Sequence, residues 1–343
     1  MKAALLQETG KVVIQTFGRP TIGPHEVLIR VEYAGVCGSD VHAYHGTHPF
    51  RKPPVILGHE VAGRIVALGE AVQGFAIGDA VTVMPYLHCG HCPPCLRGQT
   101  NVCLHKRVPG TGDWLGTFAE YFGADAAITY KLGPHTDTRR GVLAEPLAVG
   151  IHALRRGGMG SGSRVLVLGG GTIGLLTALA ARLAGATDVA LTDLYDHKLD
   201  IARAVGIEAA YNARQANLVE TIRRQHPEGF DVICLASGAA ITVEQALALI
   251  QRGGRVVVTA MFTAPVLTDL LAVTLGEVEL VGTQIYTDAD FRQALHWLEQ
   301  QGDVFELLIS RVYPLEAARD ALHTLSERPG EVIKVLLHAG AED

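Results

Sequence analysis

Hydrophobic and polar positions follow two different patterns along the chain. In residues 1–150, short apolar or alternating runs are separated by Gly and Pro, which is typical of β-strands. The strands expected there are 2–6, 12–16, 27–33, 61–68 and 80–83. From about residue 151 to 287, apolar runs at 165–168, 189–192, 231–235, 255–259 and 279–282 alternate with helical patterns. Such alternation predicts βαβ units and a parallel sheet.

The segment from residue 288 onward has a third pattern. It contains two amphipathic helical stretches around an expected strand at 307–313, followed by a last strand at 332–337. Because this segment has no glycine-rich motif of its own, we expect it to return to the N-terminal part of the chain. The predicted domains are therefore 1–150 with 288–343, and 151–287 between them.

Composition limits the classes of function. The 343 residues exceed a single ordinary core, and 48% of them are hydrophobic, as in a globular α/β enzyme. A net charge of −6 argues against a nucleic-acid partner or an anionic membrane surface. Apolar runs are too short for a membrane span or a signal peptide, so we expect a cytoplasmic protein. Its six cysteines are then thiols or metal ligands.

A glycine-rich turn follows the strand 165–168. Gly169, Gly171 and Gly174 have the spacing G-x-G-x-x-G and lead into a helix, and the next strand ends in Asp193, nineteen residues after Gly174. This pattern binds a dinucleotide, with its phosphates at the helix N-terminus and its ribose hydroxyls on the acid. Because Asp193 would repel a 2′-phosphate, we expect NAD rather than NADP. The expected cofactor-binding residues are Gly169, Gly171, Thr172, Ile173, Gly174, Asp193 and Lys198.

Four cysteines between residues 88 and 104 predict a structural metal site. Cys89, Cys92, Cys95 and Cys103 follow C-x2-C-x2-C-x7-C in a loop rich in Gly and Pro. Four thiolates suit a closed tetrahedral zinc site, whose binding energy would order a segment with little core of its own. With every position filled by sulfur, such a site has no opening for a substrate. Four incidental thiols are the less favoured alternative.

A second, scattered set predicts a catalytic zinc. A catalytic zinc needs about three protein ligands and one exchangeable position. Cys37, His59, Glu60 and Glu145 provide sulfur, nitrogen and oxygen donors from separate segments. Each of them alone is more often structural. Glu145, directly before Pro146, is either an exposed charge at a helix start or a carboxylate that faces the metal from a cleft.

The residues around these sites resemble the zinc-containing medium-chain alcohol dehydrogenases over essentially the whole chain. GHEVAGRIVALGEAV (58–72) fits the family pattern G-H-E-x-x-G-x5-G-x2-V. The segments nearest to the sorbitol (L-iditol), butanediol and threonine dehydrogenase branch are CGSDVHAY (37–44), EPLAVGIHALRRGG (145–158), GGGTIG (169–174) and YPLEAA (313–318). The resemblance implies an α/β fold, with a GroES-like β-rich catalytic domain and a Rossmann domain with a doubly wound parallel sheet.

The resemblance also implies roles for single residues. In that branch, the positions of Cys37 and His59 bind the catalytic zinc. A glutamate completes the shell, at the position of Glu60 in some members, with the position of Glu145 close by or bound through a water. Ser39 and His42 occupy the positions of a relay that carries a proton to solvent by way of the nicotinamide ribose. Asp40 would orient His59. The alternative for Ser39 and Asp40 is a helix N-cap, which is compatible with catalysis.

Substrate contacts are implied at four positions. Tyr44 and Tyr286 match residues that contact polyols, whereas Ile285 occupies the position of a substrate-binding arginine of the sorbitol-type enzymes. Together with Phe118, Ile285 would form an apolar wall that suits a compact substrate. The absence of the arginine favours a shorter vicinal diol, a cyclic polyol or an amino alcohol over sorbitol.

The predicted function is the NAD-dependent oxidation of a secondary alcohol in a polyol or vicinal diol, with two zinc ions per chain. L-threonine 3-dehydrogenase and butanediol dehydrogenase are the alternatives within the branch. A non-catalytic protein that has kept the fold is disfavoured, because both ligand sets and the glycine turn are complete. The only expected partners are a small-molecule alcohol or polyol and further copies of the chain, and the resemblance implies a homotetramer.

Overall fold

Residues 1–340 are described by a computed structural model, and they group into two units. The first contains Met1–Glu145 and the chain from Phe291 onward, and the second contains Pro146–Asp290. No helix in this described part of the chain combines the length and the apolar character needed to cross a membrane.

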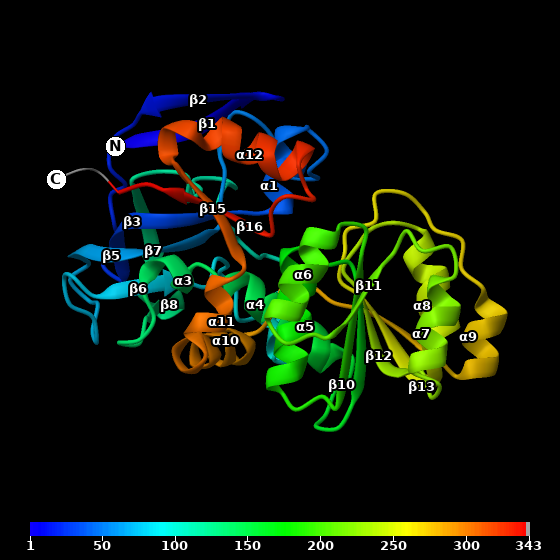
Figure 1. Ribbon diagram of the computed structural model, residues 1–343. Helices are drawn as coiled ribbons and strands as arrows, with labels where there is room; N and C mark the ends of the chain where they lie inside the picture. Colours follow the sequence, from blue (N-terminus) through cyan, green and yellow to red (C-terminus); the bar gives the residue numbers. More distant parts are fainter. Residues whose placement is uncertain (341–343) are drawn as a thin grey trace. The chain divides into compact units, whose positions relative to one another are not determined.

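The first unit is built on two sheets. Its smaller sheet has the order β2-β1-β4, and its larger sheet has the order β15-β16-β3-β5-β6-β8, with β7 paired to β3. These strands are β1 (Lys2–Glu8), β2 (Lys11–Thr16), β3 (Glu26–Val36), β4 (Val55–Ile56), β5 (Glu60–Leu68), β6 (Ala80–Val83), β7 (Tyr121–Asp125), β8 (Thr129–Lys131), β15 (Ile309–Pro314) and β16 (Lys334–His338). The last strand, β16, lies antiparallel to β3, so the end of the chain joins a sheet formed by its beginning (Figure 1).

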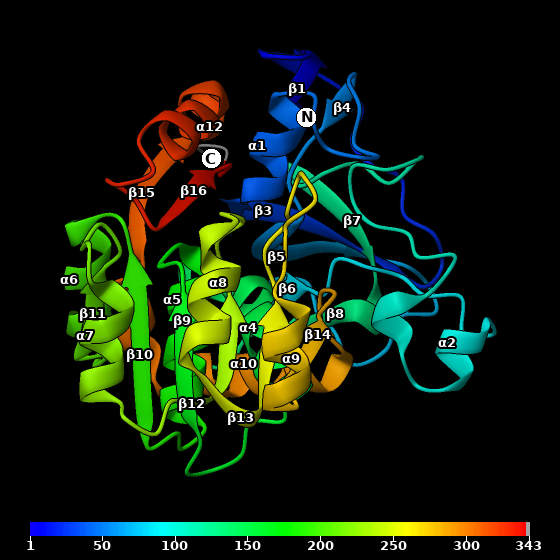
Figure 2. The same cartoon turned by 90° about the vertical axis from the view of Figure 1, so that its right-hand side faces the viewer.

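Short helices connect these strands. They are α1 (Gly38–Tyr44), α2 (Pro93–Leu96), α3 (Thr138–Gly141), α10 (Asp288–Gln300), α11 (Gly302–Glu306) and α12 (Ala318–Glu327), with 3₁₀ turns η1 (Thr100–Val102), η2 (Ala126–Ile128) and η3 (Leu315–Ala317). Helix α12 buries Ala318, Ala321 and Leu322, which lie on one face at helical spacing. Helix α2 belongs to the cysteine-rich loop, which projects from the sheets of this unit (Figure 2).

The second unit is a parallel sheet with the order β11-β10-β9-β12-β13-β14. Its strands are β9 (Arg164–Leu168), β10 (Asp188–Asp193), β11 (Ala209–Asn212), β12 (Phe230–Leu235), β13 (Ile250–Val258) and β14 (Glu279–Gly282). Helices α4 (Ala144–Arg156), α5 (Thr172–Leu183), α6 (Asp196–Ala204), α7 (Leu218–Gln225), α8 (Ile241–Leu249) and α9 (Leu270–Gly276) connect or flank them. Counted from β9, this is the doubly wound order 3-2-1-4-5-6, so the predicted fold class is confirmed.

The core of this sheet explains its sequence pattern. In β9, Val165, Leu166, Val167 and Leu168 are all fully buried, because helices cover both faces of a doubly wound sheet. A continuous apolar run is therefore the expected pattern for a central strand. The same holds for β12, whose residues 232–235 are buried.

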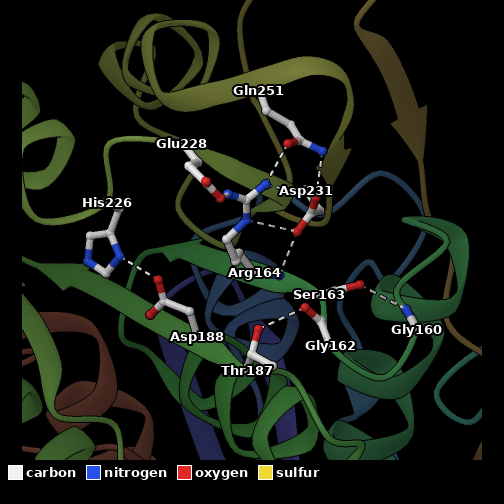
Figure 3. A network of polar contacts seen from close by, with 10 residues as sticks. All are labelled: Gly160, Gly162, Ser163, Arg164, Thr187, Asp188, His226, Glu228, Asp231 and Gln251. Atoms are coloured by element: carbon white, nitrogen blue, oxygen red, sulfur yellow. Dashed lines mark hydrogen bonds and ion pairs between the residues drawn. The ribbon is translucent and has the colours of Figure 1, made fainter.

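Polar side chains tie the amino ends of three strands together (Figure 3). At the start of β9, the backbone N–H of Arg164 donates to Asp231 Oδ2 at 2.7 Å and its guanidinium donates to Gln251 Oε1 at 2.6 Å. Arg164 also pairs with Glu228. Nearby, His226 Nδ1 lies 2.5 Å from Asp188 Oδ2 on β10. The network therefore holds the sheet at the amino ends of its strands, opposite to their carboxyl ends.

Several strands have no clear signal in the sequence. β4 has two residues, β7 and β8 are short, and β11 has the sequence AAYN. Strand β13 begins at Ile250, five residues before the apolar run, because an irregularity in its pairing with β12 separates the two parts. Near the end of the chain, β15 and β16 begin at Ile309 and Lys334, two residues later than the apolar pattern suggests.

Candidate functional site

Helix α1 positions the first group of candidate residues. Cys37 is its N-cap, and Asp40 Oδ2 accepts the backbone N–H of Cys37 at 3.0 Å, so the acid in the first turn closes the helix start. Ser39 and His42 lie three residues apart on this helix and therefore share a face. Both are partly exposed, and His42 Nδ1 lies 3.2 Å from Thr47 Oγ1.

The structure brings Cys37, His59 and Glu60 together. Their candidate ligand atoms all lie within 4.8 Å of one another. The register of β3 against β5 places Gly35 opposite Glu60, and a Cβ on Gly35 would lie 1.7 Å from Glu60 Oε2. A glycine is therefore required at that position for the carboxylate to reach the cluster.

The electrostatics of this cluster suit a divalent cation. Burial, followed by the carboxylate of Glu60, raises the pKa of the Cys37 thiol to about 12. Burial and the charge of Arg51 lower the pKa of His59 well below its usual value, so its imidazole is neutral. A neutral imidazole is the form that binds metal, and a bound cation would deprotonate the thiol. The donor set of sulfur, nitrogen and oxygen thus fits zinc.

Glu60 forms a buried ion pair that the sequence did not predict. Lys334, on β16, contacts Glu60 Oε2 and donates to the carbonyl oxygen of Val36 at 3.1 Å. Both side chains are 1% exposed. Burial alone would lower the pKa of Lys334, but the charge and hydrogen bond of Glu60, together with the nearby Cys37 and Glu145, outweigh it and raise that pKa.

Glu145 is buried in the first turn of α4 and is not a member of the three-residue cluster. Its charge nevertheless contributes to the raised pKa of Cys37 and of Lys334. Pro146 follows it within the first turn of α4, where a missing N–H costs no helical hydrogen bond.

Asp40 and Arg51 lie beside the cluster. Asp40 is fully buried, and its Oδ1 accepts the N–H of Gly58 at 3.1 Å and lies 4.0 Å from His59 Nδ1. Arg51 was not predicted as a site residue; its Nη1 lies 3.2 Å from Ser39 Oγ and 3.4 Å from His59 Nδ1. His48 lies in the same loop and is buried, and its Nδ1 accepts the backbone N–H of Arg51.

The four cysteines of the projecting loop form a second cluster. The Sγ atoms of Cys89, Cys92, Cys95 and Cys103 all lie within 4.8 Å of one another. Backbone N–H groups of Cys89 and His105 both donate to the sulfur of Cys103 at 3.3 Å. The hydrophobic cluster of this loop is formed by these four cysteines. Four converging sulfurs with little other core fit a structural zinc.

In the second unit, the glycine turn joins β9 to α5. Gly171 is the N-cap of α5, and a Cβ on Gly174 would lie 1.7 Å from the carbonyl oxygen of Gly169, so strand and helix approach too closely for any side chain. Thr172 and Ile173 form the first turn of the helix. Its free N–H groups suit a pyrophosphate.

Asp193 ends β10 next to this turn. Its Oδ2 accepts the N–H of Gly170 at 2.7 Å, and its Oδ1 accepts the N–H of Tyr195 at 3.0 Å. Lys198 Nζ lies 3.9 Å from Asp193 Oδ2. The carboxylate is therefore fixed at the carboxyl end of the strand, where a doubly wound sheet binds the ribose of its cofactor.

The four predicted substrate contacts differ in exposure. In the first unit, Tyr44 ends α1 and is partly exposed, whereas Phe118 is buried. In the second unit, Ile285 and Tyr286 follow β14, and Tyr286 is buried. Ile285 has a φ of +39°, which is strained for a β-branched residue. Strained backbone of this kind is common at ligand sites.

Comparisons with known proteins show the family of this chain. Family models match residues 23–134 as an alcohol dehydrogenase GroES-like domain and residues 172–300 as a zinc-binding dehydrogenase. A sorbitol dehydrogenase of Halalkalibacterium halodurans is 35% identical over 96% of both chains.

Two solved structures are similar over nearly their whole length. A structure described as a zinc-binding dehydrogenase from Sinorhizobium meliloti, bound to NADP, is 33% identical, with a TM-score of 0.90 over 98% of both chains. The 2R,3R-butanediol dehydrogenase of Bacillus subtilis is 26% identical, with a TM-score of 0.90 over 98% of this chain and 99% of that one.

Proposed function

Because the chain belongs to the zinc-dependent medium-chain alcohol dehydrogenases, in the sorbitol dehydrogenase-like branch, and is therefore an oxidoreductase, we propose that it oxidises a secondary alcohol of a polyol or vicinal diol. The cofactor that accepts the hydride is proposed to be NAD. The observation that carries the proposal is the convergence of Cys37, His59 and Glu60 within 4.8 Å.

We propose that Cys37, His59 and Glu60 hold the catalytic zinc. When bound, zinc supplies Lewis acidity to the alcohol oxygen and so lowers the pKa of its hydroxyl. The cluster favours Glu60 over Glu145 as the directly bound carboxylate, since Glu145 lies outside it. Glu145 would then act through its charge or through a water.

A proton must leave the substrate hydroxyl. We propose that Ser39 accepts it and that His42, one turn further along α1, delivers a proton to solvent. An imidazole that reaches water can both accept and donate a proton at neutral pH. The partial exposure of His42 supports this role.

The proposal of NAD as cofactor rests on Asp193. A carboxylate at the end of β10 accepts hydrogen bonds from the adenosine ribose and repels a 2′-phosphate. Lys198 Nζ lies 3.9 Å from that carboxylate, so its positive charge offsets part of this repulsion. The similar structure from Sinorhizobium meliloti is bound to NADP, so the preference of this chain for NAD has to be measured.

For the substrate, Tyr44, Phe118, Ile285 and Tyr286 are the proposed contacts. A hydroxyl next to the reacting carbon could bond to Tyr44 or Tyr286, while Phe118 and Ile285 offer apolar surface. Since no arginine stands at position 285, a compact diol or cyclic polyol is favoured over sorbitol. L-threonine and butanediol are the alternatives within the branch.

The test is to separate the two metal sites by substitution. We expect two zinc ions per wild-type chain. Cys37→Ala should lose one zinc and all turnover but keep its unfolding temperature within about a few degrees, because few core contacts change. Cys95→Ala should lose the other zinc and unfold at lower temperature, because the hydrophobic cluster of the loop is built from the four cysteines.

Zinc content, measured by elemental analysis of protein purified without chelator, and turnover with NAD decide the outcome. Cys234→Ala, at a buried cysteine outside both clusters, controls for the loss of a thiol. One zinc per wild-type chain, unchanged by Cys37→Ala, would mean that the mixed cluster is not a metal site.

A further inference from the structure

Arg51 is a buried cation that the proposed chemistry does not use. It lies in the loop between α1 and β4, and its side chain is 6% exposed. Its Nε is buried without a hydrogen-bond partner. Burying a guanidinium is costly unless it is paired, so its position beside the metal cluster requires an explanation.

The loop holds Arg51 in place through His48. The backbone N–H of Arg51 donates to His48 Nδ1 at 3.0 Å, so that nitrogen must be an acceptor. Burial, followed by the charge of Arg51, lowers the pKa of His48 to about 4, which agrees with a neutral ring. The arginine backbone is therefore anchored independently of its side chain.

A single nitrogen of the guanidinium faces the site. Nη1 lies 3.2 Å from Ser39 Oγ, 3.4 Å from His59 Nδ1 and 3.8 Å from Asp40 Oδ1. Asp40 supplies the negative charge nearest to it, but both oxygens of Asp40 already accept backbone N–H groups. The hydrogen bond to Ser39 is the shortest of the three contacts.

This hydrogen bond has a fixed direction. A guanidinium has only donors, so Ser39 Oγ must accept from Arg51. A hydroxyl oxygen has two lone pairs and one proton, and Arg51 occupies one lone pair. The other lone pair and the O–H are then left for two different neighbours, which is the arrangement that a proton relay needs.

On the basis of the proposed function, we propose that Arg51 is a positioning residue for proton transfer, because it orients the hydroxyl of Ser39. As the substrate hydroxyl gives its proton to the remaining lone pair of Ser39 Oγ, Ser39 passes its own proton to the next acceptor toward His42. Ser39 is neutral before and after the step, one proton reaches solvent, and Arg51 neither gains nor loses one. The oxidation balances because a bound nicotinamide cofactor would accept the hydride, with its electron pair, from the same substrate carbon.

The experiment is a double-mutant cycle of Arg51→Ala and Ser39→Ala. Removing a relay group costs about 10²–10⁴-fold in rate, so Ser39→Ala should fall in that range. Arg51→Ala alone should lower kcat by at least about tenfold, the effect of one charge-assisted hydrogen bond, and should change KM much less. In the Ser39→Ala background, Arg51→Ala should cost nothing further, because its effect passes through Ser39.

Readouts other than turnover separate positioning from structure. Zinc content of Arg51→Ala should match the wild type, and guanidinium added to that variant should restore part of kcat only when Ser39 is present. Arg51→Lys should retain part of the activity, since it keeps a donor but loses the rigid fork. Lys52→Ala, at the exposed neighbouring residue, is the matched control and should behave as the wild type.

The role of Arg51 would be overturned if the kcat losses of the two single variants multiplied in the double variant. A loss of kcat that merely followed a loss of zinc would also overturn it. If Arg51→Ala does not fold, the same cycle with Arg51→Gln gives the answer. An inactive wild type with every alcohol would instead contradict the proposed function. In that case, unfolding midpoints of the two single variants and the double variant still test the hydrogen bond between Arg51 and Ser39, because the effects of bonded residues are not additive.

Discussion

At the scale of single residues, the pair of Glu60 and Lys334 links the end of the chain to the metal cluster. Lys334 lies on the last strand, and Glu60 opens β5. Each is 1% exposed, so neither charge is accessible to water. A buried pair of this kind adds little net stability, but removing one partner leaves an uncompensated charge.

Lys334→Met should therefore destabilise the first unit strongly, by about 3–5 kcal/mol. Denaturant unfolding measures this change. Lys11→Met is the control, because Lys11 pairs with Glu8 while more than half of each side chain is exposed. Such surface pairs are worth about 0–1 kcal/mol, so the control should unfold almost as the wild type does. Equal effects of the two substitutions would show that Glu60 does not depend on Lys334.

The candidate site could be predicted from sequence only where residues form a motif. Cys37, His59 and Glu60 stand in short recognisable segments, and the structure brings these three residues together. Arg51 and Lys334 are single basic residues in a loop and a strand, and nothing nearby in the sequence distinguishes them from surface charges. Their role depends on contacts with residues elsewhere in the sequence. Arg51 lies near His59, 8 positions later, and Lys334 pairs with Glu60, 274 positions earlier.

At the scale of elements, the parallel sheet is held at its amino ends by polar side chains (Figure 3). Asp231, at the start of β12, accepts from both the backbone and the side chain of Arg164 on β9. Partial burial would raise the pKa of Asp231, but hydrogen bonds from Arg164 and its charge outweigh it and hold that pKa below its usual value. Asp231 thus binds a proton less readily in the folded state than in the unfolded chain.

The sign of the resulting pH dependence follows. The contribution of Asp231 is fully present above its unfolded pKa of about 3.9 and is lost as pH falls through the lower folded pKa. Asp231→Asn should lower the unfolding temperature by a constant amount above about pH 5, and the difference from wild type should narrow below about pH 4. Glu208→Gln, at an exposed acid, is the control. A difference that widens on acidification would contradict the assigned direction.

Helices and strands could be predicted from the sequence where burial requires a regular order of hydrophobic and polar residues. Strand β9 is an unbroken apolar run because both its faces are covered, and the glycine turn after it has a fixed spacing. By contrast, β4 and β11 are too short to show a hydrophobic periodicity. They form because the neighbouring strands β1 and β10 pair with their backbones. Their existence is a consequence of tertiary pairing.

At the scale of the whole molecule, one helix of the second unit exposes large apolar side chains. Helix α9 buries none of its residues, and Leu270, Leu271 and Leu275 are each at least 66% exposed. Next to it, β14 is the edge strand of the sheet. Several exposed leucines on a helix that precedes an edge strand are typical of an interface between subunits.

The chain should therefore self-associate through α9 and β14. We expect light scattering at micromolar concentration to give the mass of an oligomer, with a tetramer as the proposed state. Leu271→Glu should lower that mass, because it places a charge in the apolar surface. Ile77→Glu, at an exposed apolar residue of the other unit, should leave the mass unchanged. A monomeric wild type would refute the assembly.

The most direct test of the account compares kcat/KM for a panel of alcohols with NAD and with NADP. Secondary alcohols with a neighbouring hydroxyl, such as butanediol, glycerol and cyclic polyols, should exceed ethanol by about tenfold for each polar contact worth about 1.4 kcal/mol. NAD should exceed NADP for every active substrate, because of Asp193. If ethanol or benzyl alcohol gave the highest kcat/KM, or if NADP served as well as NAD, the proposed polyol oxidation with NAD would be contradicted.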